Sequence, residues 1–228
     1  MVAVDLPSGM SADSALPLTD DGAIEADFTV TFGCLKPVHV FDPGLDYCGE
    51  VRLVDIGLDE FLPSAQLHQV GDAVAAAMFA EPGSDDHKYS RGVVNVVAGS
   101  AQYPGAGVLA ARAARWGGAG MVRHVGEGAS FSADSPSVVV QSDTVIGSAA
   151  DCYVVGSGLA ADQSVLAAAL ATDALLVLDA QALNLLAQSA DSQQSLRERT
   201  AITVLTPHGG EFRRLLAGYG LSESEVEF

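Results

Sequence analysis

Short runs of apolar, often β-branched residues alternate along this chain with longer alanine-rich runs. The short runs are typical of strands covered on both faces, and the alanine-rich runs are typical of helices. Such an alternation predicts an α/β protein with a mostly parallel sheet and helices on both faces. The predicted strands are Val2–Leu6, Phe28–Phe32, Glu50–Asp55, Val93–Ala98, Met121–Val125, Cys152–Val155, Leu175–Leu178 and Ile202–Leu205. The predicted helices are Asp72–Phe79, Ala106–Trp116, Gln163–Ala171, Ala182–Gln188 and Gly210–Ala217.

One stretch interrupts this alternation. Residues 79–88 read FAEPGSDDHK, and their proline, glycine, serine and aspartates are typical of a linker. We therefore expect a domain boundary here, with one α/β piece before it and a second α/β unit after it.

Charge and cysteine content limit which binding partners and which cellular compartment we expect. The chain has 11 basic and 29 acidic residues, a net charge of −18, which disfavours nucleic acid and anionic membranes as partners. It contains neither an apolar run long enough to span a membrane nor a secretory signal pattern. Cys34, Cys48 and Cys152 have neither metal-ligand nor disulfide spacing, so we expect small buried thiols in a reducing, cytoplasmic setting.

Chemistry-bearing residues gather where predicted strands end. Residues 99–107 (GSAQYPGAG) and 156–159 (GSGL) are glycine-rich, which allows a ligand to approach the backbone closely. Asp179 follows the next strand; it either orients a ligand hydroxyl or caps the following helix, and the pattern favours the cap. His208 follows the last predicted strand. Because parallel strands bring such ends to one edge, we expect a binding cleft there.

Four blocks in the second unit together resemble the ADP-dependent NAD(P)H-hydrate dehydratase domain. They are HKYSRGVVNVVAGSAQYPGAGVLAARAARWGGAGMV (87–122), VVGSGL, VLDAQALNLL and VLTPHGGEFRRLL. The resemblance implies a ribokinase-like fold and a cytoplasmic hydro-lyase. Such an enzyme uses ADP and Mg²⁺ to remove water from the (S)-hydrate of NADH or NADPH. It also implies that Ala106, Gly158 and His208 contact the hydrated nucleotide and that Glu211 lies near the Mg²⁺–phosphate site.

The first part of the chain resembles a different domain. The blocks VAVDLPSGMSADS, ADFTVTFGCLKP and GEVRLVDIGL are similar to the last third of the NAD(P)H-hydrate epimerase domain, which implies a partial Rossmann-like piece. Carried over, Asp5 contacts the substrate and Ser8 is a potassium ligand. The implied organisation is an epimerase portion at 1–62, a linker with a helix at 63–86, and a dehydratase portion at 87–228.

Two departures from the dehydratase pattern leave alternatives open. Gln181 stands where the family has an aspartate, and the GTGD motif that supplies the catalytic aspartate is not in this sequence. We therefore assign no catalytic residue and expect a fragment of a bifunctional enzyme. The alternatives are a ribokinase-like small-molecule kinase and a non-catalytic nucleotide-binding remnant. A homo-oligomer and the choice between NADH and NADPH hydrate also stay open.

Overall fold

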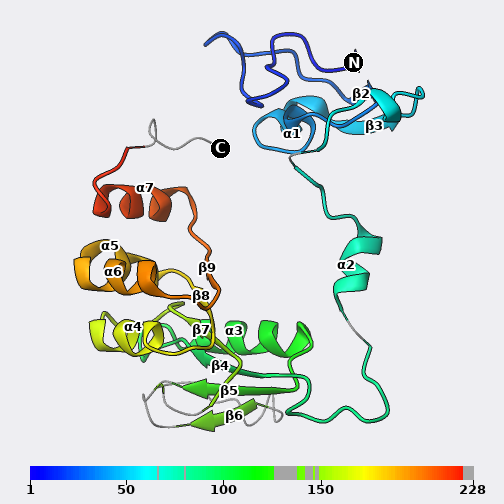
Figure 1. Cartoon of the computed structure of the whole chain (residues 1–228). Helices are drawn as coiled ribbons and strands as arrows, with labels where there is room; N and C mark the ends of the chain where they lie inside the picture. The colour runs from blue at the N-terminus through cyan, green and yellow to red at the C-terminus, as the bar shows by residue number, and fades with distance from the viewer. Residues whose placement is uncertain (66, 80, 126–137, 142–145, 147–148, 223–228) are drawn as a thin grey trace. The chain divides into compact units, whose positions relative to one another are not determined.

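The protein falls into two compact units, Met1–Met78 and Phe79–Phe228. The computed structural model describes residues 1–65, 67–79, 81–125, 138–141, 146 and 149–222, and the order of its elements can be followed in Figure 1. The division falls inside the segment 63–86 to which the sequence assigns the linker. The two units are described one at a time.

The first unit contains a three-stranded parallel sheet. Its strands are β1 (Val2–Val4), β2 (Phe28–Phe32) and β3 (Glu50–Val54), in the order β1-β2-β3. Short helices complete it: η1 (Pro37–His39), α1 (Gly44–Cys48), η2 (Asp59–Phe61) and α2 (Asp72–Met78). The three predicted strands are confirmed, each ending within two residues of its predicted bound.

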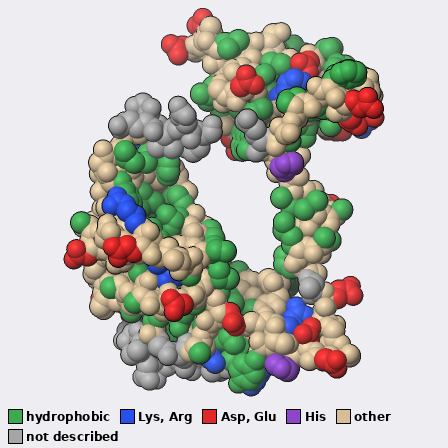
Figure 2. Space-filling view, in the orientation of Figure 1, with side chains coloured by type: hydrophobic (Ala, Val, Ile, Leu, Met, Phe, Trp, Pro, Cys, Tyr) green, Lys and Arg blue, Asp and Glu red, His purple; other side chains and the backbone are tan. Residues whose placement is uncertain are grey.

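Only part of this small sheet is covered within the unit. A core cluster of Met10, Ala15, Val38 and Cys48 packs with Val51 of β3. In contrast, Val2 and Val4 of β1 are 66% and 72% exposed. The expectation that every apolar strand is covered on both faces is therefore wrong for β1. Hydrophobic side chains also lie uncovered along α2, as Figure 2 shows.

The second unit is built on a six-stranded sheet. Its strands are β4 (Val93–Val97), β5 (Met121–Val125), β6 (Val138–Gln141), β7 (Cys152–Val155), β8 (Leu175–Leu178) and β9 (Thr203–Leu205). The order is β6-β5-β4-β7-β8-β9, and every neighbouring pair is parallel. The chain builds outward from β4 to β6, then crosses back to place β7 on the other side of β4. Such a reversal leaves a crevice outside the carboxyl ends of β4 and β7.

Helices cover both faces of this sheet, as predicted. Successive strand residues point to opposite faces. Val96 and Val122 accordingly pack with Ala111 of α3 (Pro104–Trp116) on one face. Val97 and Val155 pack on the other face in a larger cluster that includes Leu166, Leu183 and Leu215. These last three come from α4 (Gln163–Leu170), α5 (Gln181–Gln188) and α7 (Gly209–Gly218).

Two elements of the second unit were not predicted. Strand β6 is not among the predicted strands, although three of the four residues in its sequence, VVVQ, are valines. Helix α6 (Ala190–Glu198) has no apolar stripe, since the residues it buries are Ser192 and Gln193. Gln193 instead donates hydrogen bonds to carbonyls at the ends of neighbouring helices, those of Leu186 (3.1 Å) and Gly218 (3.2 Å). Leu196 is the α6 residue that packs against the larger hydrophobic cluster, and these polar contacts add to it. A search for apolar periodicity does not find such contacts.

Candidate functional site

The crevice between β4 and β7 is formed by two loops that touch. The backbone N–H of Gly99, just after β4, donates to the carbonyl of Ser157, just after β7, at 2.8 Å. Gly158 has a φ of +67°, and a Cβ added there would lie 2.6 Å from the Cβ of Ala106 in the first turn of α3. A side chain at position 158 would thus be both strained and overlapped. Ala106 and Gly158, predicted separately, meet at the point where the strand order reverses.

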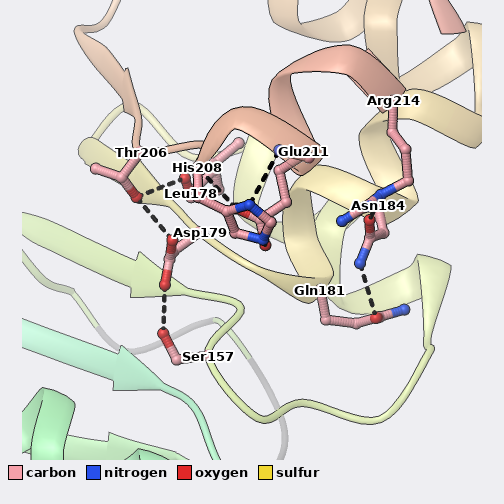
Figure 3. A network of polar contacts seen from close by, with 10 residues as sticks. Ser157, Leu178, Asp179, Gln181, Asn184, Thr206, His208, Glu211 and Arg214 are labelled. Atoms are coloured by element: carbon pink, nitrogen blue, oxygen red, sulfur yellow. Dashed lines mark hydrogen bonds and ion pairs between the residues drawn. The ribbon is translucent and has the colours of Figure 1, made fainter. Parts of the chain in front are cut away.

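Asp179 ties the neighbouring loops together at the end of β8. Its carboxylate accepts hydrogen bonds from Ser157 Oγ at 2.8 Å and from Thr206 Oγ1 at 2.9 Å, as Figure 3 shows. The following helix, α5, begins after Ala180 with no side-chain cap. The interpretation of Asp179 as a helix cap is therefore wrong. The carboxylate bridges across the sheet edge because its two partners follow the strands on either side of β8.

His208 and Glu211 form a capping box at the start of α7. His208 Nδ1 accepts from the N–H of Gly210 at 3.1 Å, and Glu211 Oε2 accepts from the N–H of His208 at 3.0 Å. His208 Nε2 lies 3.4 Å from Glu211 Oε1. The His208 side chain is 69% exposed while that of Glu211 is 9% exposed. His208 is thus the N-cap residue of α7, and most of its ring is still exposed to solvent.

A second polar chain lies beside this box. Arg214 Nε donates to Asn184 Oδ1 at 2.9 Å, and Asn184 Nδ2 donates to Gln181 Oε1 at 3.4 Å (Figure 3). Gln181, the departure from the family pattern, therefore keeps a hydrogen-bonding role without a charge. Arg214, Ser157 and Thr206 were not singled out from the sequence. All three stand inside quoted motifs, but nothing in the local pattern around Arg214 points to Asn184, 30 residues away.

The first unit holds a separate polar centre around Asp5. Lys36 Nζ lies 2.6 Å from Asp5 Oδ1, and Thr31 Oγ1 donates to the same oxygen at 2.9 Å. The hydrogen bond from Lys36 holds the pKa of the Asp5 carboxyl below its ordinary value, against the opposing effect of burial. His39 Nε2 is 2.8 Å from the Asp5 carbonyl oxygen. Sequence reasoning found Asp5 but not these partners, although Thr31 and Lys36 stand in the motif ADFTVTFGCLKP.

Ser8 and Glu211 are the residues predicted to lie at metal sites. Ser8 is an exposed residue three positions after Asp5, and its carbonyl accepts from the N–H of Ile24 at 3.0 Å. Over the residues that the structure describes, no three His, Cys, Asp or Glu side chains gather as a metal site. Glu211 supplies a carboxylate, the ligand type that Mg²⁺ takes together with nucleotide phosphates and water, but its Oε2 accepts from the His208 N–H and its Oε1 lies beside His208 Nε2.

Surface charge, cysteine exposure and helix hydrophobicity add three observations. Acidic side chains are spread over the visible faces of both units, with few basic side chains among them (Figure 2). Cys34 is exposed, Cys48 buried and Cys152 intermediate, all as free thiols, so the expectation of buried thiols is wrong for Cys34. Among the described helices, none is long and apolar enough to cross a membrane.

Comparison with known proteins gives one related sequence, two related structures and a family profile. The bifunctional NAD(P)H-hydrate repair enzyme Nnr of Mycobacterium leprae is 43% identical over 219 residues, which cover 94% of this chain and 44% of that protein. The ADP/ATP-dependent NAD(P)H-hydrate dehydratase of Bacillus subtilis, co-crystallised with ATP and Mg²⁺, superposes with a TM-score of 0.53 at 25% identity, covering 64% of this chain and 54% of that one. A ribokinase-like superfamily protein of Enterococcus faecalis shares the fold (TM-score 0.56, 24% identity, 68% and 59% covered).

These matches define what is established about the chain. It spans about half the length of the curated relatives. The parallel sheet with helices on both faces is ribokinase-like, as predicted. The sequence profile of NAD(P)H-hydrate dehydratase matches residues 94–227, more than half of the chain. The protein therefore belongs to the NAD(P)H-hydrate dehydratase family.

Proposed function

We propose that the second unit binds a hydrated nicotinamide dinucleotide and serves its ADP-dependent dehydration, and that the first unit is part of a hydrate epimerase. One observation carries the proposal for the second unit. Ala106, Gly158, Asp179 and His208 follow four adjacent strands of one parallel sheet, at the edge where its strand order reverses. That edge is where open α/β sheets bind their ligands.

The residues present suit the steps that such a dehydration needs. A hydroxyl is phosphorylated and then leaves as phosphate, so the cleft must align the hydroxyl with a nucleotide phosphate. The bare backbone at Gly158 and the small Ala106 provide a close-fitting wall for the nicotinamide nucleotide. Asp179 is held rigidly by two hydroxyl donors, so this wall and the loop of His208 keep one geometry.

His208 is the residue best placed to touch the substrate. Its Nδ1 accepts from the Gly210 N–H, so the neutral ring carries its hydrogen on Nε2. That N–H is available to the substrate as well as to Glu211 Oε1 at 3.4 Å. When bound, Mg²⁺ neutralises the charge of the nucleotide phosphates, and Glu211 is the residue we place near it. In the first unit we place the substrate at Asp5 and K⁺ at Ser8. The free thiols fit a reducing, cytoplasmic setting.

The test compares two glycines on the same side of the sheet. Gly158→Ala introduces a Cβ into the contact with Ala106, whereas Gly105→Ala meets nothing within 4 Å. We expect Gly158→Ala to lower the affinity for NADH hydrate, measured by calorimetry, by at least about tenfold. That is a loss of about 1.4 kcal/mol of binding free energy. Gly105→Ala should bind as the wild type does.

The two variants also separate binding from turnover. Recovery of NADH absorbance from its hydrate with ADP and Mg²⁺ measures dehydration. Binding without turnover would favour the non-catalytic alternative, which the uncharged Gln181 supports. Equal hydrate binding by Gly158→Ala and wild type would place the site elsewhere.

A further inference from the structure

Asp5 has a backbone conformation that is rare for a non-glycine residue, so neighbouring groups must stabilise it. Its φ is +72°, in the left-handed region that a non-glycine residue adopts only with strain. Its N–H donates to the carbonyl of Val30 in β2 at 2.7 Å, which fixes one side of the residue. The other side, its carbonyl oxygen, accepts from His39 Nε2 at 2.8 Å. Neighbouring groups thus clamp Asp5 at both backbone positions.

His39 also holds the residue that pairs with the Asp5 carboxylate. The backbone N–H of Lys36 donates to His39 Nδ1 at 3.0 Å. Lys36 Nζ in turn reaches Asp5 Oδ1 at 2.6 Å and Thr31 Oγ1 at 3.0 Å. The two nitrogens of one ring therefore hold the backbones of both members of the ion pair.

The partners define the ring's protonation state. A carbonyl oxygen can only accept, so Nε2 carries a hydrogen, and a backbone N–H can only donate, so Nδ1 carries a lone pair. His39 is 2% exposed and neutral, and burial lowers its pKa, consistent with that tautomer. A proton added to Nδ1 would face the Lys36 N–H and break this contact.

The arrangement leaves part of the carboxylate for a ligand. Both side-chain contacts of Asp5 are made to Oδ1, and within the described part of the chain Oδ2 has no partner. The Asp5 side chain is 41% exposed, compared with 26% for Lys36. An acceptor oxygen on a fixed carboxylate suits a ligand hydroxyl. By the proposed function of this unit, that hydroxyl is the one on the nicotinamide hydrate.

We propose that His39 is a positioning residue for substrate binding at Asp5. Its neutral ring sets the left-handed backbone of Asp5 and the start of the turn at Lys36, and so directs Oδ2 towards the substrate hydroxyl. Only the identity of the substrate rests on the proposed epimerase function. The positioning itself can be tested on the 228-residue chain without any ligand.

The decisive measurement is the titration of Asp5 by carbon-13 NMR of labelled aspartates, assigned by comparison with Asp5→Asn. In the wild type the Asp5 carboxyl should titrate below the ordinary aspartate range. His39→Leu keeps the bulk but loses both hydrogen bonds, so its Asp5 midpoint should rise towards that of Lys36→Met. The matched control is His87→Gln, an exposed histidine of the second unit, which should leave Asp5 unchanged.

Two conservative variants separate positioning from bulk packing. His39→Gln keeps a donor near Nε2, and His39→Asn keeps an acceptor near Nδ1, so each should restore part of the wild-type midpoint. An unchanged Asp5 titration in all three His39 variants, with the amide spectrum intact, overturns the proposal. So does unfolding of all three, because His39 would then be a core residue only.

Epimer exchange provides a separate result. In a version completed with the rest of the epimerase domain, we expect His39→Leu to lower kcat for NADH hydrate by about tenfold or more, as misplacement of a reacting group does, with a smaller change in KM. If the completed domain without substitutions exchanges no epimers, the proposed function of this unit fails. The NMR titration still decides the role of His39.

Discussion

At the scale of single residues, one side chain can serve the fold and the ligand through different atoms. His208 uses Nδ1 to cap α7, and its exposed ring leaves Nε2 to meet a substrate. A histidine in such a loop can have a structural role or a ligand role. The geometry makes them compatible, because the cap needs only one ring nitrogen. Substitutions that keep the cap but remove the ring can therefore measure each role separately.

His208→Ala should cost about 0.5–2 kcal/mol of stability, the usual loss when a capping side chain is removed. In a version completed with the C-terminal portion of the domain, it should also raise the apparent KM for the hydrate. His208→Asn places a side-chain oxygen at the cap and should keep the wild-type stability. It should still weaken substrate binding, because the ring is gone. Urea denaturation and absorbance kinetics measure the two effects. Normal KM in the asparagine variant would mean that the ring serves the helix alone.

A buried histidine in the second unit predicts a pH dependence of stability. His124 of β5 lies 2.7 Å through Nε2 from the carbonyl oxygen of Ala98, and burial lowers its pKa below the ordinary value. The unfolded chain therefore binds a proton near pH 6.5 while the folded chain stays neutral to a lower pH. Stability should be independent of this group above about pH 6.5 and fall as the pH drops below it. Denaturation of His124→Gln at pH 7.5 and 5.5 should show a smaller fall than the wild type does.

At the scale of elements, the sequence predicted the strands whose apolar residues contrast with the glycine or polar residues at both ends. Apolar runs bounded by glycine or polar residues gave Phe28–Phe32 and Met121–Val125 with their observed ends. Helix α6 was missed because Gln193 anchors it by hydrogen bonds to distant carbonyls. The role of Asp179 was misjudged for a similar reason, since its partners become neighbours only when the strand order is known. Local pattern found the site's loops, but topology decided which side chains meet there.

Asp179 should therefore act as a connection between elements. Asp179→Ala leaves the hydroxyls of Ser157 and Thr206 without their acceptor, so it should cost about 1–3 kcal/mol of stability and weaken hydrate binding. Asp191→Ala, at an exposed position in α6, is the control. Denaturation and calorimetry report the two effects. Stability as little affected as in the control would show that the loops hold their places without the carboxylate.

At the scale of the whole molecule, two polar centres belong to two units with separate sheets and cores. Asp5 and Lys36 lie in the first unit, and His208 and Asp179 lie in the second. Their hydrogen-bond networks share no residue among those described. The proposed function places one activity in each unit.

This separation predicts that the two activities can be removed independently. In a version of the protein in which both domains are completed, Asp5→Ala deletes the carboxylate that Lys36 and Thr31 hold, so interconversion of the two hydrate epimers should be lost. ADP-dependent dehydration of the (S)-hydrate by the same completed protein should continue at its unsubstituted rate, because the side-chain contacts of Asp5, with Thr31 and Lys36, lie within the first unit. Epimer exchange is followed by chromatography and dehydration by NADH absorbance, with Gly158→Ala as the reciprocal variant. Loss of both activities in Asp5→Ala, with both units folded, would contradict the assignment of one activity to each unit.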